Sequence, residues 1–298
     1  MNVHPAPDRH RKSLVRRLSS AALAVLATAF LVAPPANALA LPTPREFVSN
    51  LDLECFRTTP YQPPSVTLAL RHLNPVLVNF PIGQVTLGQR EQLCVPVAKN
   101  NVLPPPNTID YLRFVDLSCY RVTGTALDQS LSLRHLNPVL QSVPGIQVVL
   151  DRPEHLCVPV AKNGLVPAPD VLRVISHIDL LCYAHRPNVP MNRALALQQL
   201  NPVLTGQIPT ASVRVTDPRQ LCVPVLKAGD TIPPDVLDIV RWIDLERYDI
   251  IAPAIPQVTL SLRHLNPVLA GLPGETATLT GALQLAVPVA KNGQVPPG

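Results

Sequence analysis

Cysteine is the residue type with the most regular spacing in this chain. The six cysteines form three sets of two, and the two members of each set lie about 40 residues apart. Thiols at such positions can form disulfides or bind a metal ion. The chain has no Cys-x-x-Cys motif, and two widely spaced cysteines are too few to complete a tetrahedral site. The spacing therefore favours disulfides.

Histidine also recurs at one matching position, as His72, His135 and His264. The chain contains four copies of one sequence repeat, and Gln199 occupies this position in the third copy. A metal site with one histidine from each copy would therefore lack a ligand. We therefore predict no metal site.

Aspartate, lysine and asparagine are present in every copy. The aspartates are Asp52, Asp116, Asp179 and Asp244, the lysines are Lys99, Lys162, Lys227 and Lys291, and the asparagines are Asn74, Asn137, Asn201 and Asn266. We interpret the charged sets as ion pairs across neighbouring strands or as a solvated face, and a ligand contact repeated four times is the alternative. Each asparagine precedes a proline and is expected to serve a turn.

No motif in the chain indicates catalysis. There is no G-x-S-x-G, no H-E-x-x-H and no paired carboxylates at a suggestive spacing. The single tryptophan and 4% aromatic residues disfavour stacking platforms for sugars or single-stranded nucleic acid. We predict no catalytic residue, no cofactor and no enzyme activity, with a secreted hydrolase of unrecognised site as the alternative.

Three sequence strings recur in phase with one another, with a common period of about 64 residues. One reads RHLNPVL or QQLNPVL, another LCVPV or LAVPV, and a third opens each copy as LDLECF, VDLSCY, IDLLCY or IDLERY. They divide the chain into repeats over 41–107, 108–170, 171–235 and 236–298, with proline-rich joints between them.

The repeats select one disulfide pairing. The first three copies each have one cysteine in the opening string and one in LCVPV, whereas the fourth has Arg247 and Ala286 at those positions. Losing both together is expected of partners within a repeat. The predicted pairs are Cys55 with Cys94, Cys119 with Cys157, and Cys182 with Cys222. Closing each loop should stabilise the fold by about 4 kcal/mol.

Alternation of apolar and polar residues in the opening strings predicts short, half-buried strands. The proline of LCVPV places that strand at a sheet edge or bulge, and Asn163-Gly164 and Asn292-Gly293 are turn signals. No stretch keeps a helical period for three turns. The expected fold is all-β, with four tandem small domains of about 64 residues, each a sandwich or open barrel.

The segment 1–40 has the pattern of a signal peptide. A basic stretch ends at Arg17, an apolar run follows from Ala21 to Ala33, and small residues offer cleavage after Ala38 or Ala40. We expect an exported product without a membrane anchor, in a compartment where disulfides persist. Five of the 25 Lys and Arg lie in this segment, so the remainder is nearly neutral and nucleic-acid binding is not expected.

The order of Asp-Leu-x-Cys-Tyr, a VTL strand, LCxPVxKNG and a proline joint resembles an uncharacterised tandem repeat domain of secreted bacterial proteins. LCVPVAKNG is the most specific piece, and the likeness covers nearly all of the expected mature chain. The fourth repeat departs from it by lacking both cysteines. The resemblance implies export and a repeated fold, and no activity.

We therefore expect a non-catalytic module of the envelope or extracellular space, either structural or binding a surface ligand through several weak sites. The fourth repeat is expected to act as a terminal cap, with Trp242 packed against the third. Arg247 should reach a carboxylate or solvent, because an unpaired buried charge is costly.

Overall fold

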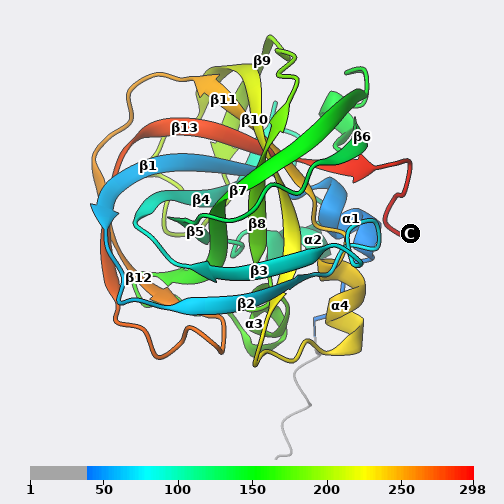
Figure 1. The fold of residues 1–298 in the computed structure, drawn as a ribbon. Coiled ribbons are helices and arrows are strands. Elements are labelled where there is room, and N and C mark those ends of the chain that lie inside the picture. Colours follow the sequence, from blue (N-terminus) through cyan, green and yellow to red (C-terminus); the bar gives the residue numbers. More distant parts are fainter. Residues whose placement is uncertain (1–38) are drawn as a thin grey trace, which may run out of the picture. The chain divides into compact units, whose positions relative to one another are not determined.

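Every repeat folds into a short helix followed by three or four strands (Figure 1). The first supplies α1 (Pro44–Ser49), β1 (Leu53–Tyr61), β2 (Thr67–His72), β3 (Pro81–Thr86) and β4 (Arg90–Lys99). The second supplies α2 (Pro106–Leu112), β5 (Leu117–Arg121), β6 (Gln129–His135), the 3-10 helix η1 (Pro138–Leu140) and β7 (Ile146–Lys162).

The other two repeats repeat this order, with one long strand in place of β3 and β4. The third supplies α3 (Pro169–Ile175), β8 (Leu180–Arg186), β9 (Arg193–Gln199) and β10 (Ala211–Lys227). The fourth supplies α4 (Pro234–Val240), β11 (Leu245–Ile251), β12 (Val258–His264) and β13 (Glu275–Lys291). This computed structural model describes residues 39–298, so the predicted signal peptide lies outside the described residues except for its last two.

Three of the four helices, α2, α3 and α4, begin in the proline-rich joints that sequence analysis placed between repeats, and α1 begins at Pro44. Each has proline in its first turn, where the missing N–H costs no hydrogen bond. In α1 the Thr43 hydroxyl accepts from the Glu46 amide and the Glu46 carboxylate accepts from the Thr43 amide, both at 3.2 Å. The helices have six or seven residues, too few to show a helical period over three turns.

Eight strands pair into one closed antiparallel sheet, which we call the closed sheet. Its order is β1, β4, β5, β7, β8, β10, β11, β13 and back to β1. Successive members come from the same repeat and then from the next one along the chain. The all-β class is confirmed, with short helices added, but the four separate domains are not what the structure contains.

The physical reason is the shortage of partners within one repeat. A unit of about 64 residues buries little apolar surface and leaves strand edges unpaired, whereas closure of eight strands removes those edges. Direct pairing of β1 with β13 joins the first repeat to the last. The fourth repeat is therefore not a terminal cap, and that expectation was wrong. Trp242 packs, partly buried, against the apolar interior.

The remaining strands cross to the opposite repeat. β2 pairs with the end of β10, β9 with the end of β4, β6 with the end of β13, and β12 with the end of β7. These strands and their hairpin partners cover the outside of the closed sheet. The opening strings are consequently buried on both faces, so the half-buried alternation predicted for them was wrong: Glu54, on the face expected to be wet, is 4% exposed.

The repeated prolines of LCVPV also lie differently from the sequence prediction. Pro96 is paired opposite Leu53 within the closed sheet, at the point where β4 passes on to pair with β9. The two Asn-Gly turns are as predicted, with positive φ at Asn163 and Asn292 and at the glycines that follow them.

The three disulfides are the predicted ones, Cys55–Cys94, Cys119–Cys157 and Cys182–Cys222. Each joins residues directly opposite on neighbouring strands of the closed sheet. Their sulfur atoms also approach one another between pairs, with Cys94 Sγ 3.7 Å from Cys119 Sγ and Cys157 Sγ 3.8 Å from Cys182 Sγ. The six sulfurs thus form one continuous row inside the closed sheet.

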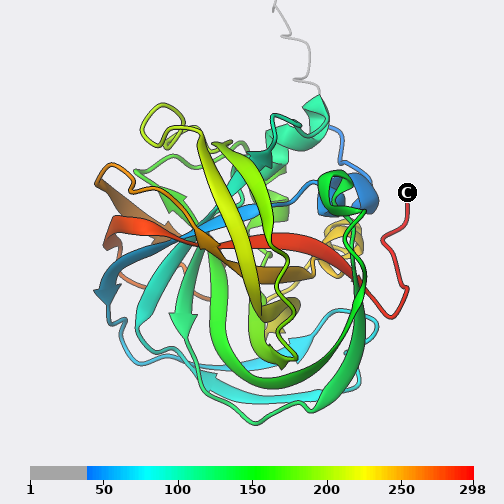
Figure 2. The same ribbon diagram turned by 90° about the horizontal axis from the view of Figure 1, so that it is seen from above.

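The helices close one end of this interior. Each helix precedes the first strand of its repeat by a few residues, so all four lie at the ends where β1, β5, β8 and β11 begin; α1 and α4 are seen together at the right of Figures 1 and 2. Apolar side chains from the helices, among them Phe47, Val174 and Val240, form one core cluster with the six cysteines. We call the opposite end of the closed sheet, where those strands finish, the mouth.

Candidate functional site

A layer of polar side chains lies inside the closed sheet, between the sulfur row and the mouth. Four of them occupy the same position, two residues before the second cysteine of each repeat or before its replacement, Ala286. They are Gln92, His155, Gln220 and Gln284. All four are at most 9% exposed. We call these four residues and Arg247 the polar layer.

Arg247 is the centre of the polar layer. Its Nη1 donates to Gln220 Oε1 at 2.9 Å, and its Nη2 donates to the side-chain oxygens of Gln92 and Gln284. Gln92 belongs to β4, which does not pair with β11, so this contact crosses the interior. The side chain is 1% exposed. The expectation that Arg247 reaches a carboxylate or solvent was wrong.

Two of the three glutamines connect the cation to carboxylates that it does not touch. Gln220 donates to Glu154, and Gln284 Nε2 donates to Asp249 Oδ1 at 3.1 Å. Burial lowers the pKa of Arg247 to about 10, and the charges of Glu154 and Asp249 oppose that shift. Each amide therefore accepts from the guanidinium and donates to an acid, which spreads the buried charge toward the mouth.

His155 is the one titratable member of the repeated set. Its Nδ1 lies 3.0 Å from Gln220 Nε2, and its Nε2 lies 3.2 Å from Glu91 Oε2. Burial and the nearby Arg247 lower its pKa, against the attraction of Glu91. The ring is therefore disposed to be neutral and accepts from Gln220 on one side.

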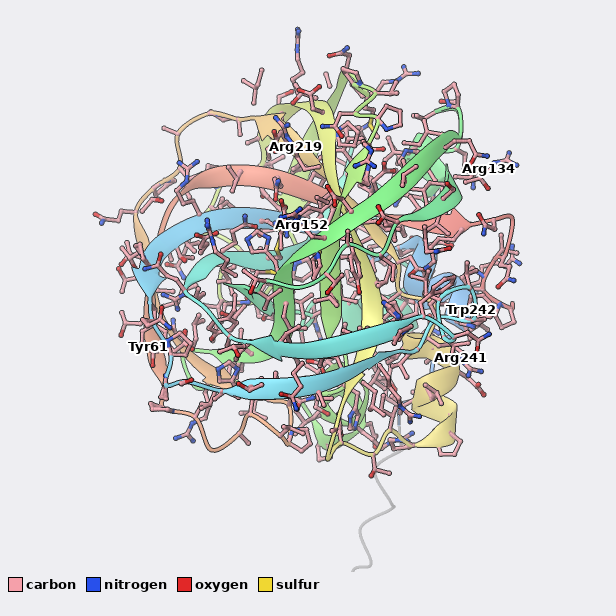
Figure 3. All side chains as sticks on the ribbon, in the orientation of Figure 1. Tyr61, Arg134, Arg152, Arg219, Arg241 and Trp242 are labelled. Carbon is pink, nitrogen blue, oxygen red and sulfur yellow. A yellow bond between two sulfur atoms is a disulfide. The ribbon has the colours of Figure 1, made fainter. Side chains whose placement is uncertain are left out.

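Two hollows at the mouth reach down to the polar layer. One, of about 430 Å³, is lined by Arg57, Glu91 and Gln92 among other residues. The other, of about 320 Å³, includes Arg121 and the set Arg152, Glu154 and His155. Figure 3 shows Arg152 and Arg219 well apart from Arg241 and Trp242, which lie beside α4.

Fixed ion pairs connect the strands around the mouth. Arg121 donates to Glu91 Oε1 from Nη2 at 2.7 Å and from Nε at 3.1 Å, and Arg219 pairs with Asp249 at 2.5 Å. Arg57 forms no ion pair with a carboxylate among the described residues. The mouth therefore combines neutralised side chains with guanidinium groups open to a ligand.

The repeated aspartates and lysines lie at the helix end and are buried, not solvated. The pairs are Lys99–Asp52, Lys162–Asp116, Lys227–Asp179 and Lys291–Asp244. None of the eight side chains is more than 5% exposed. Burial raises the pKa of Asp52 and lowers that of Lys99, and their mutual attraction opposes both shifts. These pairs cannot be four ligand contacts.

The repeated asparagines complete these pairs across repeats. Asn137 Nδ2 donates to Asp52 Oδ2 at 2.7 Å, and its Oδ1 accepts from the Val139 amide at 2.9 Å. The other three copies make the same bonds, each to the aspartate of the preceding repeat, with Asn74 bonded to the fourth. The predicted turn role is confirmed, and the bond to aspartate is an additional one.

The repeated histidines pair with tyrosines of the opposite repeat. The ring Nε2 atoms of His72, His135 and His264 lie 3.0 to 3.2 Å from the hydroxyls of Tyr183, Tyr248 and Tyr120 respectively. At the fourth position the tyrosine is replaced by Phe56, and Gln199 donates instead to Glu54 at 2.6 Å. Residues 39–298 contain no group of three His, Cys, Asp or Glu side chains suited to a metal ion.

The polar layer was missed in the sequence, although a signal was present. Gln92 lies two residues before Cys94, and His155 two residues before Cys157, so each polar side chain points to the same face of its strand as the cysteine. That face is the interior of the closed sheet. The contact of Arg247 with three glutamines depends on closure, which the repeat period does not encode.

Comparison with protein-family models, with curated proteins and with solved structures finds no match to this chain. No helix within the described part of the chain is long and apolar enough to cross a bilayer. Three disulfides are typical of proteins that work in an oxidising compartment.

Proposed function

We propose that the protein is exported and acts outside the cytoplasm as a non-catalytic binding protein, and that the mouth is its binding surface. The observation that carries the proposal is the pair of hollows that lead to the polar layer. Hollows of about this size accommodate small ligands when a few convergent polar groups are present.

The lining favours an anionic ligand. Arg57 and Arg152 present guanidinium groups at the mouth, and neither is closer than 4.0 Å to a carboxylate among the described residues. A guanidinium binds carboxylate or phosphate oxygens through paired hydrogen bonds. The buried charge of Arg247 adds to the positive potential beneath them.

The closed sheet changes the expected mode of binding. Four weak sites on separate domains would act by avidity, but here the four repeats contribute to one mouth. The repeated charged side chains that could have supplied four contacts are buried at the other end. We therefore propose that one protein molecule binds no more than two ligand molecules, one in each hollow.

The test is a titration of the folded protein with citrate, inorganic phosphate and neutral glucose, followed by NMR of the arginine Nε–H groups. Citrate or phosphate should shift the signals of Arg57 and Arg152 at millimolar concentration, and glucose should not. Arg57→Gln with Arg152→Gln should abolish saturable binding. Arg241→Gln, at the helix end, is the matched control and should leave it unchanged.

Binding that is insensitive to the mouth variants, or equal shifts at Arg241, would reject the mouth as the site. Turnover of chromogenic ester or glycoside substrates would instead favour the hydrolase alternative. The buried cluster of Arg90, Glu275, Tyr120 and His264 gives that alternative no support, because all four side chains are at most 5% exposed.

A further inference from the structure

The backbone of Leu39 is held by two side chains of the folded body. Its amide nitrogen lies 3.2 Å from Asp170 Oδ2 in α3, and its carbonyl oxygen accepts from the Tyr111 hydroxyl of α2 at 2.9 Å. The Leu39 side chain packs against the same apolar cluster as the helices. Residue 39 is therefore an integrated part of the fold.

Asp170 is also available for a cation. It forms no ion pair with a lysine, arginine or histidine among residues 39–298. The nearest candidate on its own helix, Arg173, is committed to Asp235 through bonds of 2.9 and 2.7 Å. A positive charge at the Leu39 nitrogen would thus meet an uncommitted carboxylate.

The sequence leaves two cleavage positions open, after Ala38 and after Ala40. Cleavage after Ala40 would remove Leu39 and leave both Asp170 and the Tyr111 hydroxyl without these partners. Cleavage after Ala38 would retain every contact and turn the amide nitrogen into an ammonium group. A hydrogen bond between an ammonium group and a carboxylate, in which both partners are charged, is stronger than the hydrogen bond from a neutral backbone N–H that it replaces.

We propose that the Ala38–Leu39 peptide bond is the processing site and that the new amino terminus pairs with Asp170. A signal peptidase hydrolyses this bond: water adds its hydroxyl to the Ala38 acyl carbon and a proton to the Leu39 nitrogen, and the new carboxyl group then loses its proton to the amine, which leaves a carboxylate and an ammonium group. The ammonium group then ties the start of the chain to α3. This inference rests on the export proposed above, and not on ligand binding at the mouth.

The first test is export of the full chain from a bacterial host, with intact mass and amino-terminal sequencing of the product. A single product beginning Leu39-Ala40-Leu41 is expected. A product beginning at Leu41 would overturn the processing site and leave export standing. A full-length product that stays in the cytoplasm would overturn both.

The second test measures the pairing with Asp170 by thermal unfolding. Mature chains that begin at Leu39 or at Leu41 are compared, each with Asp170 and with Asp170→Asn. In the Leu39 chain the variant should lower Tm by about 2 to 4 °C, and in the Leu41 chain by none. Asp170→Glu should restore part of the loss in the Leu39 chain.

Acetylation of the Leu39 amine provides the matched charge control, because it keeps the nitrogen and removes its charge. It should lower Tm as much as Asp170→Asn does, and add nothing in that variant. Equal losses from Asp170→Asn in the two chains, or no effect of acetylation, would overturn the ion pair.

Discussion

Asn74 and Asp244 lie 170 residues apart, and Asn74 Nδ2 donates to Asp244 Oδ2 at 2.7 Å. This bond joins the first repeat to the fourth, and three equivalent bonds join each later repeat to the one before it. Each bond belongs to a separate cluster of Asn, Asp and Lys at the helix end, and the four clusters together link the four repeats in a closed cycle.

Asn74→Ala should destabilise the whole protein and not the first repeat alone. It removes the bond that Asn74 Nδ2 donates to a buried carboxylate and the bond that Asn74 Oδ1 accepts from the Val76 amide, so a loss of about 2 kcal/mol is expected. Urea unfolding followed by circular dichroism measures it. Asn107→Ala, on the exposed side of α2, is the control and should change little. A second, separate transition in the variant would contradict the shared cycle.

Because Glu54 is buried, we expect the stability of the protein to depend on pH. Burial raises the pKa of Glu54 from 4.5 to about 7, so the folded state binds its proton more tightly than the unfolded state does. The stabilisation of the folded state by this tighter proton binding is fully present below pH 4.5 and is lost as the pH rises through about 7. At pH 8 Glu54→Gln should therefore be more stable than the parent by about 3 kcal/mol, and at pH 4 nearly equal to it.

The contrasting variant is Glu275→Gln, measured over the same pH series. Glu275 Oε2 accepts from Arg90 Nη1 at 2.9 Å, and both side chains are buried. Removing its charge leaves a buried cation uncompensated, so a loss of about 3 to 5 kcal/mol is expected at pH 8. If Glu54→Gln destabilised the protein as Glu275→Gln does, the proposed cost of the Glu54 charge would be wrong.

A fourth disulfide should form in the double variant Arg247→Cys with Ala286→Cys. These residues are directly opposite on β11 and β13, as the three natural cysteine pairs are on their strands. A nonreducing peptide map should show the new link. Loop closure contributes about 4 kcal/mol, against which the three glutamine oxygens lose their donor. Two free thiols at these positions would show that the register differs.

Cys55→Ser should permit a rearrangement of the remaining disulfides. The freed Cys94 sulfur lies 3.7 Å from Cys119 Sγ, so its thiolate can attack that sulfur, form Cys94–Cys119 and release Cys157 as a thiolate. Peptide mapping after acid quenching should detect both pairings. Asn107→Ala, which keeps all six cysteines, should show the natural pairs only. Exclusive retention of Cys119–Cys157 would exclude exchange along the row.

The strands and disulfides were predictable from the sequence because their signals are local and repeated. The helices were not, since two turns after a proline such as Pro106 carry too little periodicity. Closure was missed because a repeat period says nothing about which copies pair. In the sequence, Gln199 interrupts the set of repeated histidines. In the structure, the position that holds the partner tyrosine in the other copies is Phe56, which has no hydroxyl, and Gln199 bonds to Glu54 instead. The contacts of Arg247 could not be predicted from the sequence, because its three glutamine partners belong to three other strands.

Closure also fixes how many repeats the protein can have. A solenoid can gain or lose a unit by duplication or deletion, because each unit contacts only its neighbours. Here removal of one repeat would take two strands from the closed sheet and interrupt the cycle that Asn74 and Asp244 complete. The geometry of the closed sheet therefore fixes the number of repeats at four.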